Sequence, residues 1–257
     1  RFTTKTFAQL VVGVGEGLCE LTAVLLGVGL IVGAFSVTGL AGTLVNDIVF
    51  IAGDSVLALL LMGALTAFIF GMGMTVTACY IFLAIVLAPA LEQAGLNTLA
   101  VHLFILYWGM VSYITPPVAL GAFAAATLAG AKPLATGFEA MRLGGTIYIV
   151  PFFFVLNPAL VAEAPAWEVL IVFVTAILGV ALLSMSLQGH TAIFGSLGQG
   201  ISKFISRVML FIAGLFFAMP ASEFIGLGHL GLSAIGFLLA LPVLVLAVMR
   251  EKRASLA

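Results

Sequence analysis

The sequence predicts an all-α integral membrane protein. Of its 257 residues, 63% are hydrophobic and 7% are charged, and the mean hydropathy is +1.33. Soluble domains contain about 25% charged residues, so this chain is far too apolar for that class. Helices are expected because hydrocarbon offers no hydrogen bonds to the backbone, and a helix bonds its own polar groups. The nine basic residues are scattered along the chain, which gives no indication of nucleic-acid binding.

The N-terminal part predicts one membrane span followed by a polar link. Residues 1–16 have an amphipathic pattern. Residues 17–35 are long enough to cross a bilayer, which takes about 20 apolar residues. Residues 36–54 contain two aspartates and neither Lys nor Arg, as expected of an external loop. The chain begins with Arg rather than Met, which favours a fragment of a longer polypeptide.

Residues 55–91 predict a re-entrant hairpin. Its first arm, residues 55–70, would form a helix about 24 Å long, and the return arm, residues 77–91, is similarly short. Both arms are marginal for a hydrocarbon core about 30 Å thick. The tip between them reads GMGMTVT at residues 71–77. Its glycines allow the backbone to turn where a side chain would clash.

A second interruption lies within residues 99–130, a stretch too long for one straight span. Thr115, Pro116 and Pro117 stand near its centre. Proline lacks a backbone donor and clashes with the preceding turn, and the residue before it is pushed out of the helical conformation. The stretch is therefore expected to form two half-helices joined by an unwound link near the middle of the membrane.

Two further elements are expected before Pro165. Residues 132–142 predict a short amphipathic arm, and residues 144–160 predict another span. Asn157 and Pro158, near the end of that span, are more typical of a helix-end cap than of a substrate contact.

Beyond the joint near Pro165, the chain predicts an accessory tail of transmembrane helices. Three apolar segments are long enough to cross a membrane, namely residues 167–187, 204–220 and 230–249. They hold few polar residues and no pair of helix breaks. We therefore divide the chain into residues 1–160, which carry both breaks, and residues 161–257, which form the tail.

The basic residues predict the orientation in the membrane. When the spans are followed alternately and the hairpin is counted as a return, all nine lysines and arginines fall on one side. Positively charged loops mark the cytoplasmic side of a membrane protein. The C-terminus is therefore expected in the cytoplasm.

The two breaks together predict a cation site of neutral oxygens. In secondary transporters, unwound carbonyls and the C-terminal ends of half-helices coordinate Na⁺. Neither break contains Asp or Glu, which argues against a protonated carboxylate. The candidate residues are Gly71, Gly73, Thr75, Thr77, Ser112, Thr115, Pro116 and Pro117. A simpler alternative stays open, because glycine also allows membrane helices to pack closely.

Other polar residues are weaker candidates. His102, His190 and His229 lie apart in sequence and near expected helix ends, so we interpret them as interfacial rather than as metal ligands. The sequence contains no recognisable pair of nucleophile and base and no cluster of metal ligands. Neither an enzyme nor a bound cofactor is therefore expected.

Four stretches resemble one known family in their order along the chain. They are GMGMTVTACY at residues 71–80, APAL at 88–91, HLF at 102–104 and ITPPVAL at 114–120. Together they are similar to the C-terminal half of the large membrane subunit of tripartite ATP-independent periplasmic (TRAP) transporters. The fused permease of the TAXI subgroup is the nearest type, since it also tends to carry extra C-terminal helices. The resemblance covers residues 1–160 well and the tail less specifically.

The resemblance implies a Na⁺-coupled, elevator-type importer in the cytoplasmic (inner) membrane of a bacterium or archaeon. Its solute would be a carboxylate received from an extracytoplasmic solute-binding protein. Residues 71–77 would be the tip of the second hairpin, and Thr115 to Val118 would be the unwound link at a Na⁺ site, which adds Val118 to the candidates. Thr75 departs from the proline that the family commonly has there, which would loosen the tip or supply another hydroxyl.

The resemblance also implies what accompanies this chain in the lipid bilayer. Residues 1–160 would be the second half of an inverted-repeat transport core. Its partners would be the N-terminal half of the same permease and a small membrane domain, and the chain would not transport alone. Two alternatives remain: a passive channel or pore subunit, and a membrane scaffold subunit without an ion site of its own.

Overall fold

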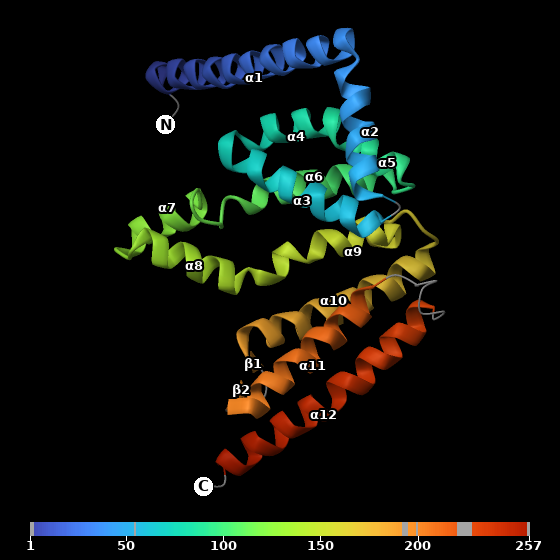
Figure 1. The fold of residues 1–257 in the computed structure, drawn as a ribbon. Helices are drawn as coiled ribbons and strands as arrows, with labels where there is room; N and C mark the ends of the chain where they lie inside the picture. The colour runs from blue at the N-terminus through green and yellow to red at the C-terminus, as the bar shows by residue number, and fades with distance from the viewer. Residues whose placement is uncertain (1–2, 54, 192–194, 199, 220–227, 256–257) are drawn as a thin grey trace.

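The computed structural model describes residues 3–53, 55–191, 195–198, 200–219 and 228–255. Within these residues the chain is almost entirely helical, which confirms the predicted all-α class. Figure 1 shows most helices stacked as rods, with the N-terminal helix at one end of the stack and the C-terminal helix at the other. The described strands, β1 (His190–Thr191) and β2 (Gly195–Ser196), form a small antiparallel pair.

The first two helices differ from the expected span and loop. The lead-in and the span are one continuous helix, α1 (Thr4–Thr38). The expected polar link is also a helix, α2 (Leu40–Ala52), so that prediction was wrong. A single Asp within an apolar helix costs up to about 0.7 kcal/mol relative to Ala, which does not stop the helix. The chain breaks instead at Gly39 and Gly53, which have φ angles of +70° and +61°.

Two helices occupy the stretch expected to form a hairpin, α3 (Val56–Gly73) and α4 (Val76–Val86). Figure 1 shows the chain turning back between them. The turn consists of Met74 and Thr75, both of which are extended. Thr75 also starts α4, because its side chain accepts a hydrogen bond from the Ala78 N–H.

The long stretch with the prolines is divided into two helices. α5 (Ala88–Gln93) leads into α6 (Thr98–Val111), and α7 (Leu120–Ala129) follows after an irregular link at residues 112–119. The peptide bond between Pro116 and Pro117, within the link, is cis. The backbone leaves the helical path after Val111, before the prolines, and resumes it at Leu120.

The expected span at residues 144–160 is not a single helix. It consists of two short 3₁₀ helices around a short α-helix, in the order η1 (Gly145–Tyr148), α9 (Val150–Leu156) and η2 (Pro158–Val161). Both α9 and η2 have a proline in their first turn, where its missing N–H removes no helical bond. α8 (Pro133–Leu143) precedes them, and the chain bends by 65° between α8 and the segment that contains α9.

The C-terminal tail contains the three spans that the sequence predicts. They are α10 (Ala166–Gln188), α11 (Gly200–Ala218) and α12 (His229–Ser255). Among the described residues, these three helices are long and apolar enough to cross a membrane, and the bent pair of α8 and the η1–α9 segment would make a fourth. Together with the composition, they confirm an integral membrane protein.

α10 and α11 cross closely through two glycines. A Cβ added at Gly214 would lie 2.7 Å from Leu183 Cγ and 2.8 Å from the Gly179 carbonyl oxygen. A Cβ added at Gly179 would lie 2.8 Å from the Gly214 carbonyl oxygen. Small residues give membrane helices most of their mutual van der Waals contact by allowing such an approach. The crossing therefore depends on both glycines.

We expect Gly214→Val to push α10 and α11 apart, because neither backbone can yield. Overpacking of this kind costs about 1–3 kcal/mol and should lower the melting temperature of the detergent-purified protein by several degrees. Gly13→Val in α1 is the matched control, since a Cβ added there meets nothing within 4 Å. Equal melting temperatures for the two variants would contradict the close approach of α10 and α11 at Gly214.

α3 approaches α6 even more closely, at Gly71. A Cβ added at Gly71 would overlap the Gly109 carbonyl oxygen. Gly109 in turn faces α4, since a Cβ added to it would lie 3.4 Å from Cys79 Sγ. Both helices around the turn of the hairpin are thus packed against the last part of α6. This packing brings the first interruption next to the second.

We expect Gly71→Ala to displace the end of α3 from α6, since the new methyl group would overlap backbone atoms. The melting temperature should fall, and fluorescence or cross-linking between the hairpin turn and the link should report a greater separation. Gly63→Ala, also in α3, is the control, because its Cβ would meet only the flexible end of Leu87 at 3.3 Å. If Gly71→Ala is as stable as Gly63→Ala, the close approach is not as described.

Candidate ion site

A serine hydroxyl joins the two interruptions. Ser112 is the first residue of the link and is only 1% exposed. Its Oγ lies 2.9 Å from the Gly71 carbonyl oxygen and 3.0 Å from the Gly109 carbonyl oxygen. A hydroxyl has one proton, so the two carbonyls share it. The contact ties the last turn of α3 to residues 41 positions further along the chain.

The last turn of α3 provides carbonyl oxygens at the turn of the hairpin. The last four carbonyls of a helix have no partner within that helix, and in α3 they belong to residues 70–73. The Gly71 carbonyl accepts from Ser112. The partial negative charge of a helix C-terminus makes this position favourable for a cation.

The link adds further open carbonyls. Its internal hydrogen bonds run from the Ala119 N–H to the Ser112 and Thr115 carbonyls, both at 3.1 Å, and from the Thr115 N–H to the Ser112 carbonyl at 3.3 Å. Open carbonyls in a membrane protein are stable only where protein, water or a ligand satisfies them. Within the described part of the chain, no hydrogen bond reaches the carbonyls of Ile114, Pro116, Pro117 and Val118.

Ala119 closes the link in a conformation that alanine rarely adopts. Its φ and ψ angles are +40° and +39°, in the left-handed region, and its side chain is fully buried. A non-glycine residue held in this region costs about 1–3 kcal/mol and persists only where its surroundings impose it. The two hydrogen bonds from its N–H provide that constraint. The shape of the link is therefore imposed by its surroundings rather than by local preference.

Thr115 is the most buried hydroxyl in the link after Ser112, at 5% exposure. Its Oγ1 lies 2.8 Å from the Val111 carbonyl oxygen and 2.6 Å from Tyr148 Oη. If Thr115 donates to Val111, the Tyr148 hydroxyl donates to Thr115, and one lone pair of Oγ1 stays free. Sequence reasoning missed Tyr148. Its signal was a tyrosine in an apolar stretch, because a buried tyrosine hydroxyl usually needs a partner.

The remaining candidates occupy less enclosed positions. Thr75 and Thr77 lie exposed at the turn and in the first turn of α4, and Thr75 Oγ1 already accepts from a backbone N–H. Within the described residues, neither threonine hydroxyl bonds to the link. Pro116 and Val118 are half-buried, and Pro117 is exposed. The structure thus brings Gly71 and Ser112 together directly and leaves the threonines of the turn at the edge of the site.

His102 and Asn157, which lie outside the breaks, have structural partners. His102 lies 3.2 Å from Tyr80 Oη through Nδ1 and 3.7 Å from Glu92 Oε1 through Nε2. Asn157 accepts a hydrogen bond from the Ala159 N–H, which confirms its expected role as a cap. Among the residues that the structure describes, no group of three His, Cys, Asp or Glu side chains is placed to bind a metal. A cation at the breaks would therefore be held by neutral oxygens.

Comparison with known proteins adds one finding. The family model for the tripartite ATP-independent periplasmic transporter, DctM component, matches residues 1–168, well over half of the 257 residues. Searches of curated proteins and of solved structures gave no match. The matched part includes both breaks and Tyr148, whereas α11 and α12 lie beyond it. The chain therefore belongs to the DctM component family of tripartite ATP-independent periplasmic transporters.

Proposed function

We propose that this chain forms a Na⁺-binding half of a secondary transporter that imports a carboxylate-type solute. Its family works with an extracytoplasmic binding protein and a small membrane subunit, and it is a transporter family rather than an enzyme family. The observation that carries the proposal is the hydrogen bond from Ser112 to the Gly71 carbonyl. It joins two helix interruptions in a chain that has very few charged residues.

Na⁺ is the ligand that the available groups favour. Small hard cations prefer carbonyl, hydroxyl and water oxygens. The breaks offer the open carbonyls of the link, the final carbonyls of α3 and the Thr115 hydroxyl. A monovalent ion does not require the carboxylates that a divalent ion usually binds. The site therefore suits Na⁺ better than Ca²⁺ or Mg²⁺.

Coupling follows from the division of the ligands between two elements. The end of α3 and the link each supply only part of the oxygens, so Na⁺ binds best when the hairpin lies against the link. A ligand shifts a conformational equilibrium by its difference in affinity for the two states. The N-termini of α4 and α7 start at the same two breaks, and their partial positive charges favour a carboxylate there. Na⁺ and an anionic solute would thus stabilise the same arrangement.

We also propose a subgroup, a repeat organisation and a transport mechanism for this chain. We infer a fused permease of the TAXI subgroup from the helices that continue beyond the matched residues. Residues 1–160 would be the second half of an inverted-repeat core that moves by an elevator mechanism, completed by the N-terminal half of the same permease. Broken helices at a shared site are the feature that such transporters have in common.

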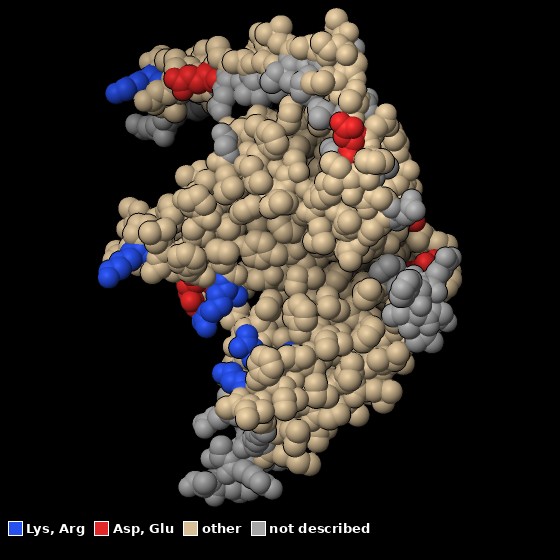
Figure 2. Space-filling model, in the orientation of Figure 1, with Lys and Arg blue, Asp and Glu red and all other residues tan. Residues whose placement is uncertain are grey.

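The charge distribution supports a cytoplasmic position for the C-terminus in the inner membrane of a bacterium or archaeon. In Figure 2, the lysine and arginine side chains in view lie along one edge of the molecule. This is the pattern expected where one side faces the cytoplasm. Arg1, Asp54, Glu223 and the side chains of residues 250–253 lie outside the described part and do not contribute to the argument.

We expect Thr115→Val to weaken Na⁺ activation of solute uptake. Uptake would be measured in proteoliposomes that contain the complete permease and its binding protein, as a function of Na⁺ concentration. An oxygen bound to a charged partner contributes about 1.5–3 kcal/mol to the binding free energy. The Na⁺ concentration for half-maximal activation should therefore rise at least about tenfold. Thr127→Val is the matched control, because the exposed Thr127 hydroxyl donates to the Phe123 carbonyl of its own helix.

Other outcomes would support other functions. An unchanged Na⁺ dependence of Thr115→Val, together with normal folding, would reject the site. Conductance without the binding protein would indicate a passive pore. A lower melting temperature with an unchanged Na⁺ response would indicate that the breaks serve only to pack a scaffold.

A further inference from the structure

One face of α10 lines two neighbouring cavities, of 310 Å³ and 570 Å³. The lining residues follow each other at alternating spacings of three and one residues and share that face. In order along α10 they are Phe173, Ala176, Ile177, Val180, Ala181, Ser184, Met185 and Gln188. We call the two cavities together the seam groove, since they lie between the tail and the segment from α8 to η2.

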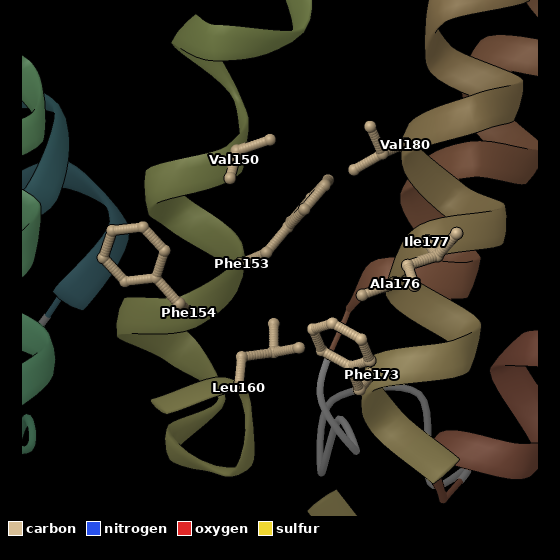
Figure 3. Close-up of a pocket in the computed structure, with 8 residues that line it drawn as sticks. All are labelled: Val150, Phe153, Phe154, Leu160, Phe173, Ala176, Ile177 and Val180. Atoms are coloured by element: carbon tan, nitrogen blue, oxygen red, sulfur yellow. The ribbon is translucent and has the colours of Figure 1, made fainter. Parts of the chain in front are cut away.

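The first part of the seam groove is lined by apolar side chains alone. Figure 3 shows Phe153 of α9 reaching across toward Val180 of α10, and Leu160 facing Phe173. A polar solute would lose its hydration here without gaining a hydrogen bond. The chain lies in a membrane, so the apolar molecules that surround this part are lipid acyl chains. This end of the groove suits a hydrocarbon chain.

The second part is polar at its far end. Gln188 Nε2 donates to the Arg142 carbonyl at 3.0 Å, which joins the end of α10 to the end of α8. The side chains of Arg142 and His190 also line this cavity. A Cβ added at Gly189 would lie 3.4 Å from Lys203 Nζ, so Lys203 reaches the same end of α10.

Positive charge at this end exceeds negative charge. Arg207 Nε and Nη2 donate to the Ser186 and Leu187 carbonyls at 2.7 Å and 2.9 Å. Arg142 is paired with Glu139, but within the described residues neither Lys203 nor Arg207 is in ion-pair contact with a carboxylate. In Figure 2, blue side chains gather where α8 meets the ends of α10 and α11. Three cations and one carboxylate therefore lie near the ends of α8 and α10, and this excess of positive charge favours an anionic ligand.

The length of the groove matches one leaflet. From Phe173 to Gln188 the helix rises about 22 Å. Half of a bilayer, including its headgroup region, measures about 20–22 Å. An amphiphile with its charged group at Arg142 and Lys203 would thus have room for its chain along α9 and α10. Basic pockets between membrane helices on the cytoplasmic side are known to bind anionic headgroups.

We propose that the seam groove binds one anionic phospholipid of the cytoplasmic leaflet. The headgroup phosphate lies at Arg142 and Lys203, and an acyl chain fills the cavity between α9 and α10. The lipid fills the space between the part that carries the ion site and the tail. This inference does not depend on the proposed Na⁺ coupling.

The test is native mass spectrometry of the full chain in detergent, with phosphatidylglycerol and phosphatidylcholine added at equal concentration. The wild type should retain phosphatidylglycerol preferentially. Arg142→Gln combined with Lys203→Gln should reduce that retention at least about fivefold, because one basic residue near an anionic membrane surface contributes about a factor of five. Lys132→Gln, an exposed basic residue at the start of α8, is the matched control.

A second pair of variants tests the apolar part of the seam groove, where the acyl chain is proposed to lie. Ala176→Trp should fill the apolar cavity and reduce retention of phosphatidylglycerol, whereas Val174→Trp, which is exposed on α10 and does not line the cavity, should not. Equal retention of the two lipids, or no effect of the charge variants, would overturn the proposal. Displacement by inorganic phosphate would indicate a site for a free anion. A dimer that Ala176→Trp dissociates would indicate that a second copy occupies the groove.

Discussion

The hydrogen bond from the Ser112 hydroxyl to the Gly71 carbonyl is the interaction on which the arrangement of the two breaks depends. A membrane gives an interrupted helix no water for its free backbone groups, so each break needs a partner inside the protein. Here the Ser112 hydroxyl at one break donates a hydrogen bond to a free carbonyl at the other. Gly71 allows the contact because a side chain there would overlap the Gly109 backbone of α6. The carbonyl oxygens that stay open, at residues 114 and 116–118 of the link, are the ones available to the proposed ion.

The same physical rule explains why the tail is built differently. α10 and α11 are unbroken, so their backbone groups are satisfied within each helix, and the helices are free to meet through Gly179 and Gly214. The tail meets the rest of the chain along the seam groove, where α10 runs beside α8 and α9. Rigid helices on one side of this groove and a bent, proline-containing segment on the other leave space between them. The part of the chain with broken helices contains both interruptions, and the tail consists of long helices.

Much of the fold could be predicted because apolar composition and proline have direct structural consequences. The three tail helices and the interruption at Pro116 and Pro117 were predicted from length and backbone chemistry alone. Two predictions failed where local signals were weak: Asp47 did not stop α2, and prolines divided residues 144–160 into short pieces. The contact between Ser112 and Gly71 could not be computed from spacing, since it depends on how α3 and α6 pack. Tyr148 was missed for the same reason, because its partner Thr115 is 33 residues away.

The measurement that tests the central claim most directly is a high-resolution structure of the complete permease in NaCl, compared with one in choline chloride. The account predicts a density present only with Na⁺, between the last turn of α3 and the link, contacted by link carbonyls and the Thr115 hydroxyl. The hairpin turn should also be better ordered with Na⁺. Identical density at the two breaks in both salts, with Na⁺ still required for uptake, would contradict the account and locate the coupling ion elsewhere.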